Sequence, residues 1–213
     1  MTDMDRRAFF SSSLKKATTK AVQYADNKAA KKAGQWFRPP YAINELDFLL
    51  ACTRCGECIS ACEFGVLFSL PAQYGSTAFK TPAMDLINKG CHLCTDWPCV
   101  AVCEPAALKK PEAVVQVTLQ TDENTEVVED KAEPVDNSAP PKMALAKISD
   151  ERCLPYRGPE CGACRSSCKV EGALGWDLTK PVINPVLCCG CGLCRQACIT
   201  DPSSITIHTL LPE

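Results

Sequence analysis

The sequence predicts an α+β fold with sparse secondary structure, organised by its cysteines rather than by one large apolar core. Three observations lead to this prediction. The chain of 213 residues contains 17 cysteines, whereas aromatic residues make up only 7%. Most of the cysteines are separated by two or three residues, too close for convenient pairing within each group. The stretches with helix or strand patterns are short, so little regular structure is expected around them.

Sixteen of the cysteines fall into four groups of four. The first and fourth groups have the spacing CxxCxxCxxxC, the second has CxxCx4CxxxC, and the third has its first cysteine set back by seven residues. The groups are Cys52, Cys55, Cys58, Cys62; Cys91, Cys94, Cys99, Cys103; Cys153, Cys161, Cys164, Cys168; and Cys188, Cys191, Cys194, Cys198.

This spacing is typical of [4Fe–4S] ligation. A tight loop with a cysteine at every third residue brings three thiolates to three corners of one cubane, and the fourth cysteine reaches a neighbouring cluster in two-cluster ferredoxins. We therefore predict four [4Fe–4S] clusters with these sixteen cysteines as ligands. The remaining cysteine, Cys189, is predicted to be a packed thiol outside the ligand set. A thiol that tunes or replaces a ligand is the alternative.

Other uses of so many cysteines fit less well. Disulfide scaffolds usually have an even count and a signal peptide, and neither is present here. Zinc sites are typically CxxC pairs separated by a longer loop, whereas these cysteines come in fours. We expect no catalytic residues, because no nucleotide-binding fingerprint is present and His92 and His208 lack acid–base partners. Both histidines are predicted to be surface or packing residues.

Composition divides the chain into four regions. Residues 1–40 form a basic leader with nine Lys or Arg against three Asp, predicted to be partly helical or disordered. Residues 41–120 carry groups one and two, and 143–213 carry groups three and four, although the two cluster modules could interleave these regions. Between them, 121–142 is an acidic loop in which 121–141 has seven acidic residues and three Pro.

Short elements are expected around the cysteines. Glu45 to Ala51 suits a helix that leads into the first group. Residues 114–119 and 204–210 are candidate strands. No stretch approaches the roughly 20 apolar residues of a membrane span. The apo chain is not expected to fold without its clusters.

Several stretches resemble one family. RPPYAINELDFLLACTRCGECISACE (38–63), CLPYRGPECGACRSSC (153–168) and CCGCGLCRQAC (188–198) resemble the ferredoxin-type NapF/NapG/MauM family, accessory proteins of periplasmic nitrate reductase and of methylamine utilisation. CHLCTDWPCVAVC (91–103) is similar to NapG and to electron-transfer subunits of molybdenum oxidoreductases. That similarity implies two ferredoxin-like modules of two clusters each, with groups two and three in one module and groups one and four in the other. Sequential pairing, one with two and three with four, is the alternative.

The resemblance implies a non-enzymatic electron carrier that relays electrons between a quinol-side or ferredoxin-side donor and a partner oxidoreductase. The partners it implies are a molybdenum oxidoreductase and a membrane quinol-oxidising subunit. The alternative is a maturation factor that assists iron–sulfur assembly in a molybdoenzyme. Four clusters at about −2 each would bring the formal charge from −2 to about −10, which disfavours nucleic acid as a partner.

The basic leader is the part of the sequence that indicates the cellular compartment of the protein. Arg6 and Arg7 belong to a motif like a twin-arginine export signal, but lysines interrupt the apolar stretch that such a signal needs. We therefore expect a cytoplasmic protein, with periplasmic export through a degenerate signal as the alternative. The leader also has the spacing of a basic amphipathic helix, which is compatible with peripheral contact with a membrane surface.

Overall fold

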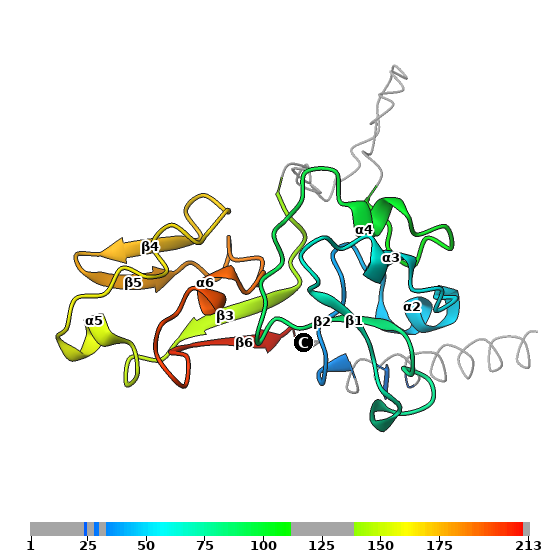
Figure 1. Ribbon diagram of the computed structural model, residues 1–213, viewed down its shortest axis with the longest axis horizontal. Coiled ribbons are helices and arrows are strands. Elements are labelled where there is room, and N and C mark those ends of the chain that lie inside the picture. The colour runs from blue at the N-terminus through cyan, green and yellow to red at the C-terminus, as the bar shows by residue number, and fades with distance from the viewer. Residues whose placement is uncertain (1–23, 25–27, 30–32, 112–138, 211–213) are drawn as a thin grey trace, which may run out of the picture.

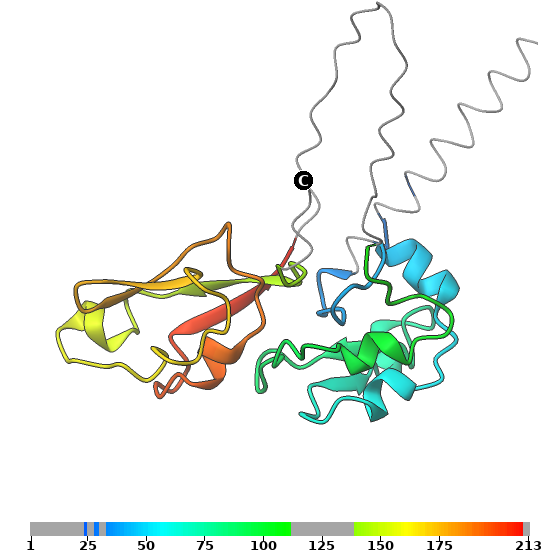
Figure 2. The same cartoon turned by 90° about the horizontal axis from the view of Figure 1, so that it is seen from above.

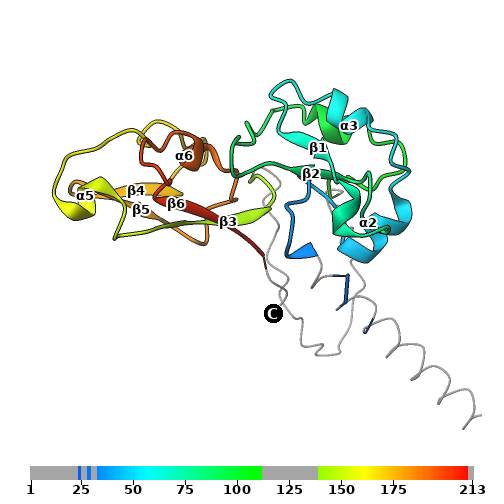
Figure 3. The same ribbon diagram turned by 60° about the horizontal axis from the view of Figure 1, so that its bottom comes forward.

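The computed structural model describes residues 24, 28–29, 33–111 and 139–210. Most of the basic leader, the predicted strand at 114–119 and most of the acidic loop lie outside these ranges, so what we expect of them stays a prediction. The described chain forms two lobes that lie side by side (Figure 1). The first lobe contains residues 33–111, the second contains 139–210, and the separation persists in the views from above and below (Figures 2 and 3).

Secondary structure in the first lobe is sparse, as predicted. Its two short strands pair antiparallel with Leu67 opposite Met84, and its helices have seven residues at most. The elements are α2 (Glu45–Ala51), α3 (Glu57–Ser60), β1 (Leu67–Ser69), the 3-10 turn η1 (Ala72–Tyr74), β2 (Pro82–Met84) and α4 (Pro98–Ala101).

The helix predicted at 45–51 is confirmed as α2. Asn44 caps it, since its side-chain oxygen accepts a hydrogen bond from the Asp47 amide at 3.0 Å. Phe48 on the inner face is fully buried in the core of this lobe. The helix ends at Cys52, whose amide donates to the Phe48 carbonyl at 2.9 Å, so the first predicted ligand directly follows a buried turn.

Arg38 ties the entry of the chain to both α2 and β2. Its guanidinium makes two bonds to the Glu45 carboxylate, at 2.6 and 2.9 Å, and two more to the Thr81 hydroxyl and the Pro82 carbonyl. It also lies over the Phe48 ring at 4.5 Å. The ion pair is largely shielded from water, because the two side chains are 11% and 9% exposed. This network explains why an Arg-Pro-Pro sequence precedes the first cysteine group.

The second lobe is built on two antiparallel ladders. The longer ladder joins its first strand to its last, with Ala144 opposite Thr209 and Ile148 opposite Ile205. The strand predicted at 204–210 is therefore confirmed. The elements are β3 (Ala144–Ile148), α5 (Leu154–Arg157), β4 (Leu174–Asp177), β5 (Lys180–Ile183), α6 (Leu193–Gln196) and β6 (Ile205–Thr209).

The two lobes touch through two cysteine loops. The Cys91 amide donates to the Cys191 carbonyl at 2.7 Å, and the Gly90 amide donates to the Gln196 side-chain oxygen at 2.7 Å. Lys169 reaches across to the His92 carbonyl, also at 2.7 Å. The start of β3 joins the core of the first lobe through Ala144, which is fully buried. The chain beyond the acidic loop is therefore anchored on both lobes.

Within the described ranges, no helix has the length and apolar character needed to cross a bilayer.

Candidate iron–sulfur sites

All seventeen cysteines lie in the described ranges, and all are unpaired thiols. The sixteen predicted ligands line four cavities, four to a cavity. The first cavity is lined by Cys52, Cys55, Cys58 and Cys103; the second by Cys62, Cys91, Cys94 and Cys99; the third by Cys168, Cys188, Cys191 and Cys194; and the fourth by Cys153, Cys161, Cys164 and Cys198.

Each cavity combines three cysteines of one group with the last cysteine of a neighbouring group. Cys103 of group two lines the first cavity, while Cys62 of group one lines the second. The second lobe repeats this exchange with Cys198 and Cys168. None of these four cavities combines groups two and three, so the pairing implied by the molybdoenzyme resemblance differs from the arrangement in the structure. The cysteines follow the sequential alternative.

Local contacts explain this outcome. The two ends of the first lobe meet where Ala42 pairs with Leu108 and the Ile43 amide donates to the Ala107 carbonyl at 3.1 Å. Residues 42 to 108 therefore close on themselves, with groups one and two inside. The β3–β6 ladder closes the second lobe around groups three and four in the same way.

A shared turn presents the second and third cysteines of groups one and four. Gly56 and Gly192 both adopt a left-handed conformation, with φ of 85° and 83°, and each begins a one-turn helix. That conformation favours glycine because a Cβ would strain it. At Gly192 a Cβ would also lie 3.2 Å from the Leu86 carbonyl oxygen. The CGxC sequence thus turns the chain so that both of its cysteines line one cavity.

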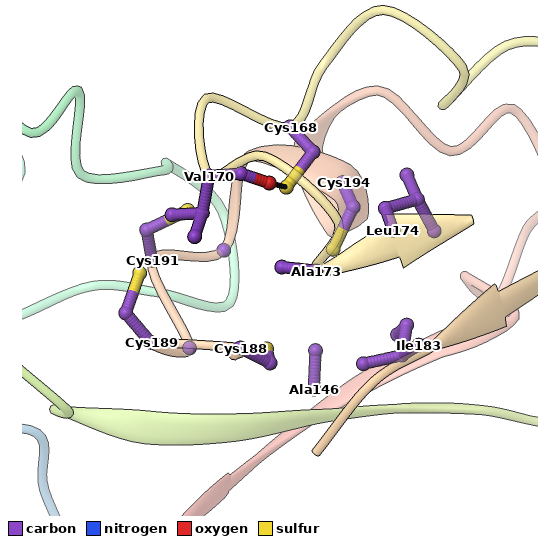
Figure 4. A pocket seen from close by; sticks show the side chains of 12 residues that line it. Ala146, Cys168, Val170, Ala173, Leu174, Ile183, Cys188, Cys189, Cys191 and Cys194 are labelled. Carbon is purple, nitrogen blue, oxygen red and sulfur yellow. Dashed lines mark hydrogen bonds between the residues drawn. The ribbon is translucent and has the colours of Figure 1, made fainter. Parts of the chain in front are cut away.

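The four cavities are similar in size and are lined mainly by cysteine and apolar side chains. Their free volumes, counted out to the mouth, are between 340 and 390 Å³. Apart from cysteine, the third cavity is lined by small and apolar side chains. Figure 4 shows Cys168, Cys188 and Cys194 around the same space as Ala146 and Ala173. No three His, Cys, Asp or Glu side chains of the described ranges come close enough to hold a single metal ion, since the cysteines surround a space rather than meet at a point.

The thiols are poorly suited to remain as isolated groups. Burial and neighbouring cysteines raise the pKa of Cys58 to about 11 and that of Cys99 to about 12. The same causes raise the pKa of Cys194 to about 12. Four thiolates around one apolar cavity repel each other. Metal ions bound among them supply positive charge that offsets this repulsion and keeps the coordinating sulfurs deprotonated. The donor set therefore fits an iron–sulfur group.

Hydrogen-bond donors already point at several sulfurs. The Leu108 amide donates to the Cys103 sulfur at 3.4 Å. Burial raises the pKa of Cys198, but hydrogen bonds from the Thr200 and Ser203 hydroxyls and from backbone amides outweigh it, and the pKa falls to about 7. The sequence shows these hydroxyl residues shortly after Cys198, at Thr200 and Ser203, but their spacing did not indicate that they would bond to its sulfur.

Cys189 is only 3% exposed and lines the third cavity beside its four predicted ligands. A hydrogen bond from its thiol to Cys191, opposed by burial, lowers the pKa of Cys191 to about 7. The same bond, together with burial, raises the pKa of Cys189. The structure thus buries Cys189 as expected and places it beside the predicted ligand Cys191 in the same cavity, while its exclusion from the ligand set remains a prediction.

His92 is a packing residue, as predicted. Its ring stacks on Phe64 with a centroid separation of 3.6 Å and an angle of 2° between the planes. Both rings line the second cavity. Burial and the nearby Lys169 lower the pKa of His92.

Four cavities lined by sixteen cysteines, in a fold with little regular structure, define a ferredoxin-type iron–sulfur protein. The chain is 30% identical to the ferredoxin-type protein NapG of Escherichia coli over 196 residues, which cover 86% of this chain and 74% of NapG. It is 29% identical to the methylamine utilization ferredoxin-type protein MauM of Paracoccus denitrificans, over 80% of this chain and 70% of MauM. It is also 30% identical to the ferredoxin-type protein NapF of Escherichia coli, over 84% of this chain and 89% of NapF. The chain belongs to this NapG/MauM/NapF family of ferredoxin-type proteins.

No protein-family model matches the chain. No solved structure matches it either. The names of the relatives agree with an electron carrier rather than an enzyme.

Proposed function

We propose that this protein carries four [4Fe–4S] clusters, one in each cavity, and relays single electrons between a quinol-side or ferredoxin-side donor and a partner oxidoreductase. The sixteen cysteines that line the cavities are the proposed ligands, and Cys189 is not one of them. The observation that carries the proposal is the series of contacts that links the four cavities one after another across both lobes, which we call the row.

Contacts between cysteines support each step along the row. The first and second cavities share the core of the first lobe, which contains cysteines of both groups. The second and third meet where the Cys91 amide bonds to the Cys191 carbonyl. The third and fourth share the apolar cluster around Cys164, with Cys188 and Cys194 packed against it. An electron at one end therefore has neighbouring sites along the whole length of the molecule.

The protein groups around the cavities suit electron storage without substrate binding. Iron–sulfur clusters supply reversible uptake of one electron, at potentials set by hydrogen bonds to sulfur and by exposure to solvent. Apolar side chains line the third cavity, and amide and hydroxyl donors stabilise negative charge on sulfurs such as Cys103 and Cys198.

Exchange with a partner is proposed at the ends of the row. Cys55 is the exposed member of the seventeen cysteines, and it lines the first cavity. The names of the relatives point to nitrate reduction and methylamine utilisation systems, so a molybdenum oxidoreductase and a membrane quinol-oxidising subunit are the proposed partners. A cytoplasmic location remains part of this proposal.

The test is anaerobic isolation of the full chain, followed by iron and sulfide analysis and EPR-monitored reduction. Sixteen irons and sixteen sulfides, with four clusters that each take up one electron, are expected. Cys91→Ser should damage the second cluster and interrupt transfer between the ends, whereas Cys189→Ser should leave four clusters. Zinc in place of iron, or fewer than four reducible clusters in the native protein, contradicts the proposal.

Affinity purification from the native host tests the partners. Capture of a quinol-oxidising subunit or a mature reductase supports the relay. Capture mainly of a molybdoenzyme precursor that lacks its own cluster would instead establish a role in maturation.

A further inference from the structure

One tryptophan lines a cysteine cavity with an unused hydrogen-bond donor. Trp176 lies on β4 opposite Pro181 of β5, and both residues line the fourth cavity. The indole packs in the same apolar cluster as Cys164 and Cys198. Its Nε1–H is buried and has no hydrogen-bond partner in the described part of the chain.

A buried donor without an acceptor is costly and uncommon, so it calls for an explanation. An indole nitrogen only donates, and no other group of the side chain compensates for a missing acceptor. Solvent does not reach this atom, and because Trp176 lines the fourth cavity, an occupant of that cavity can serve as the acceptor. The sulfurs of a bound iron–sulfur group carry partial negative charge and accept such bonds.

Neighbouring contacts fix the position of the indole. The guanidinium carbon of Arg165 lies 4.3 Å from the ring centroid, so a cation covers one face. Opposite on β5, the Pro181 carbonyl accepts a hydrogen bond from the Tyr156 hydroxyl at 3.0 Å, which holds the paired strand in place. The indole is thus held beside the cavity by a cation, a strand partner and the apolar cluster.

We propose that the Trp176 Nε1–H donates a hydrogen bond to a sulfur of the iron–sulfur group in the fourth cavity, and that this bond raises the reduction potential there. This inference rests on the proposed function. Uptake of one electron increases the negative charge on the cluster, so a donor stabilises the reduced state more than the oxidised state. The indole keeps its proton throughout and no covalent bond changes. Trp176 is a tuning residue and not a ligand.

Trp36 provides a matched control. Its Nε1–H is likewise buried without a partner, but Trp36 packs against Leu70 and Ala83 and lines none of the four cysteine cavities. Removal of the same donor at position 36 should therefore leave every potential unchanged.

The experiment is a redox titration of the full-length, cluster-loaded protein, monitored by EPR. Trp176→Phe should lower the reduction potential of one cluster by about 59 mV, which corresponds to a tenfold change in the equilibrium constant for uptake of one electron. Trp36→Phe should shift none. A second variant places benzothienylalanine at position 176, where sulfur replaces the N–H and the ring shape is nearly kept. It should show the same shift as Trp176→Phe.

A shift with Phe but none with benzothienylalanine would mean that packing or water entry, and not the N–H, sets the potential, and would overturn the inference. Unchanged potentials in both variants, with iron content intact, would also overturn it. Iron analysis of the native protein tests the proposed function separately from the role of Trp176, because absence of the fourth cluster there contradicts the proposed function itself.

Discussion

Gly90 lies at the contact between the lobes, where there is no room for a side chain. A Cβ at this position would lie 2.7 Å from both the amide nitrogen and Cδ2 of Leu193, and 2.8 Å from its Cα. Two of these atoms belong to the backbone of α6, so a change of rotamer does not relieve the clash. Gly90→Ala must therefore move the loop that carries Cys91 away from the loop that carries Cys191.

The magnitude follows from the two ways in which the protein can respond. Overpacking of this kind costs about 1–3 kcal/mol. Opening the contact instead gives up the Gly90–Gln196 and Cys91–Cys191 hydrogen bonds, at about 0.5–1.5 kcal/mol each. The protein takes the response that costs less, so the closed contact should be destabilised by about 1–3 kcal/mol. This lowers the equilibrium constant between the closed and the open contact roughly 5- to 150-fold.

The assay compares magnetic coupling between clusters in the fully reduced protein and the rate at which an electron equilibrates between lobes. Gly90→Ala should reduce both while keeping four clusters. Gly162→Ala is the matched control, because Gly162 also adjoins predicted ligands but a Cβ there meets nothing within 4 Å. If Gly90→Ala retains native coupling and transfer with all clusters present, the row does not depend on this contact and the reasoning fails.

Three further predictions concern stability and loading. Arg38→Met should destabilise the first lobe by about 3–5 kcal/mol because it leaves the shielded Glu45 carboxylate unpaired, and the temperature of cluster loss should fall accordingly. Cys99 and Cys194, each with a pKa raised to about 12, keep their protons at neutral pH and must release them to iron. Loading should therefore strengthen as pH rises, by up to about 1.4 kcal/mol per unit for each proton released, and chelator competition across neutral pH measures this; a flat profile would contradict it. Cys189→Ala should keep all four clusters, because the other four cysteines of the third cavity are its predicted ligands, and loss of iron would show that Cys189 is a ligand.

Spacing predicts that the first three cysteines of each group lie on one short segment, and in the structure these three line one cavity, while their role as cluster ligands stays a prediction. Local sequence also predicts α2, where Asn44, the acidic first turn and Phe48 all favour a helix. The helix and the sets of three cysteines both depend on residues close together in sequence, which is why these two features carried over into the structure.

The pairing of groups depended on contacts that spacing does not encode. The last cysteine of each group can reach any neighbouring cavity, so the motif is equally compatible with either pairing. The choice follows from long-range contacts such as Ala42 with Leu108 and the β3–β6 ladder. Similarly, nothing around Trp176 in the sequence indicates that it lines a cysteine cavity, since its neighbours Arg165 and Pro181 come from separate segments.

The reciprocal exchange of last cysteines has a consequence for assembly and repair. Within the first lobe, Cys103 lines the cavity of group one while Cys62 lines that of group two. Neither cavity has its full set of cysteines until both loops are folded, so oxidative loss of one proposed cluster should loosen the loop that supplies the other. The two sites of each lobe should thus gain and lose their clusters together. Cluster insertion and repair would then proceed in two steps, one for each lobe, rather than in four independent steps.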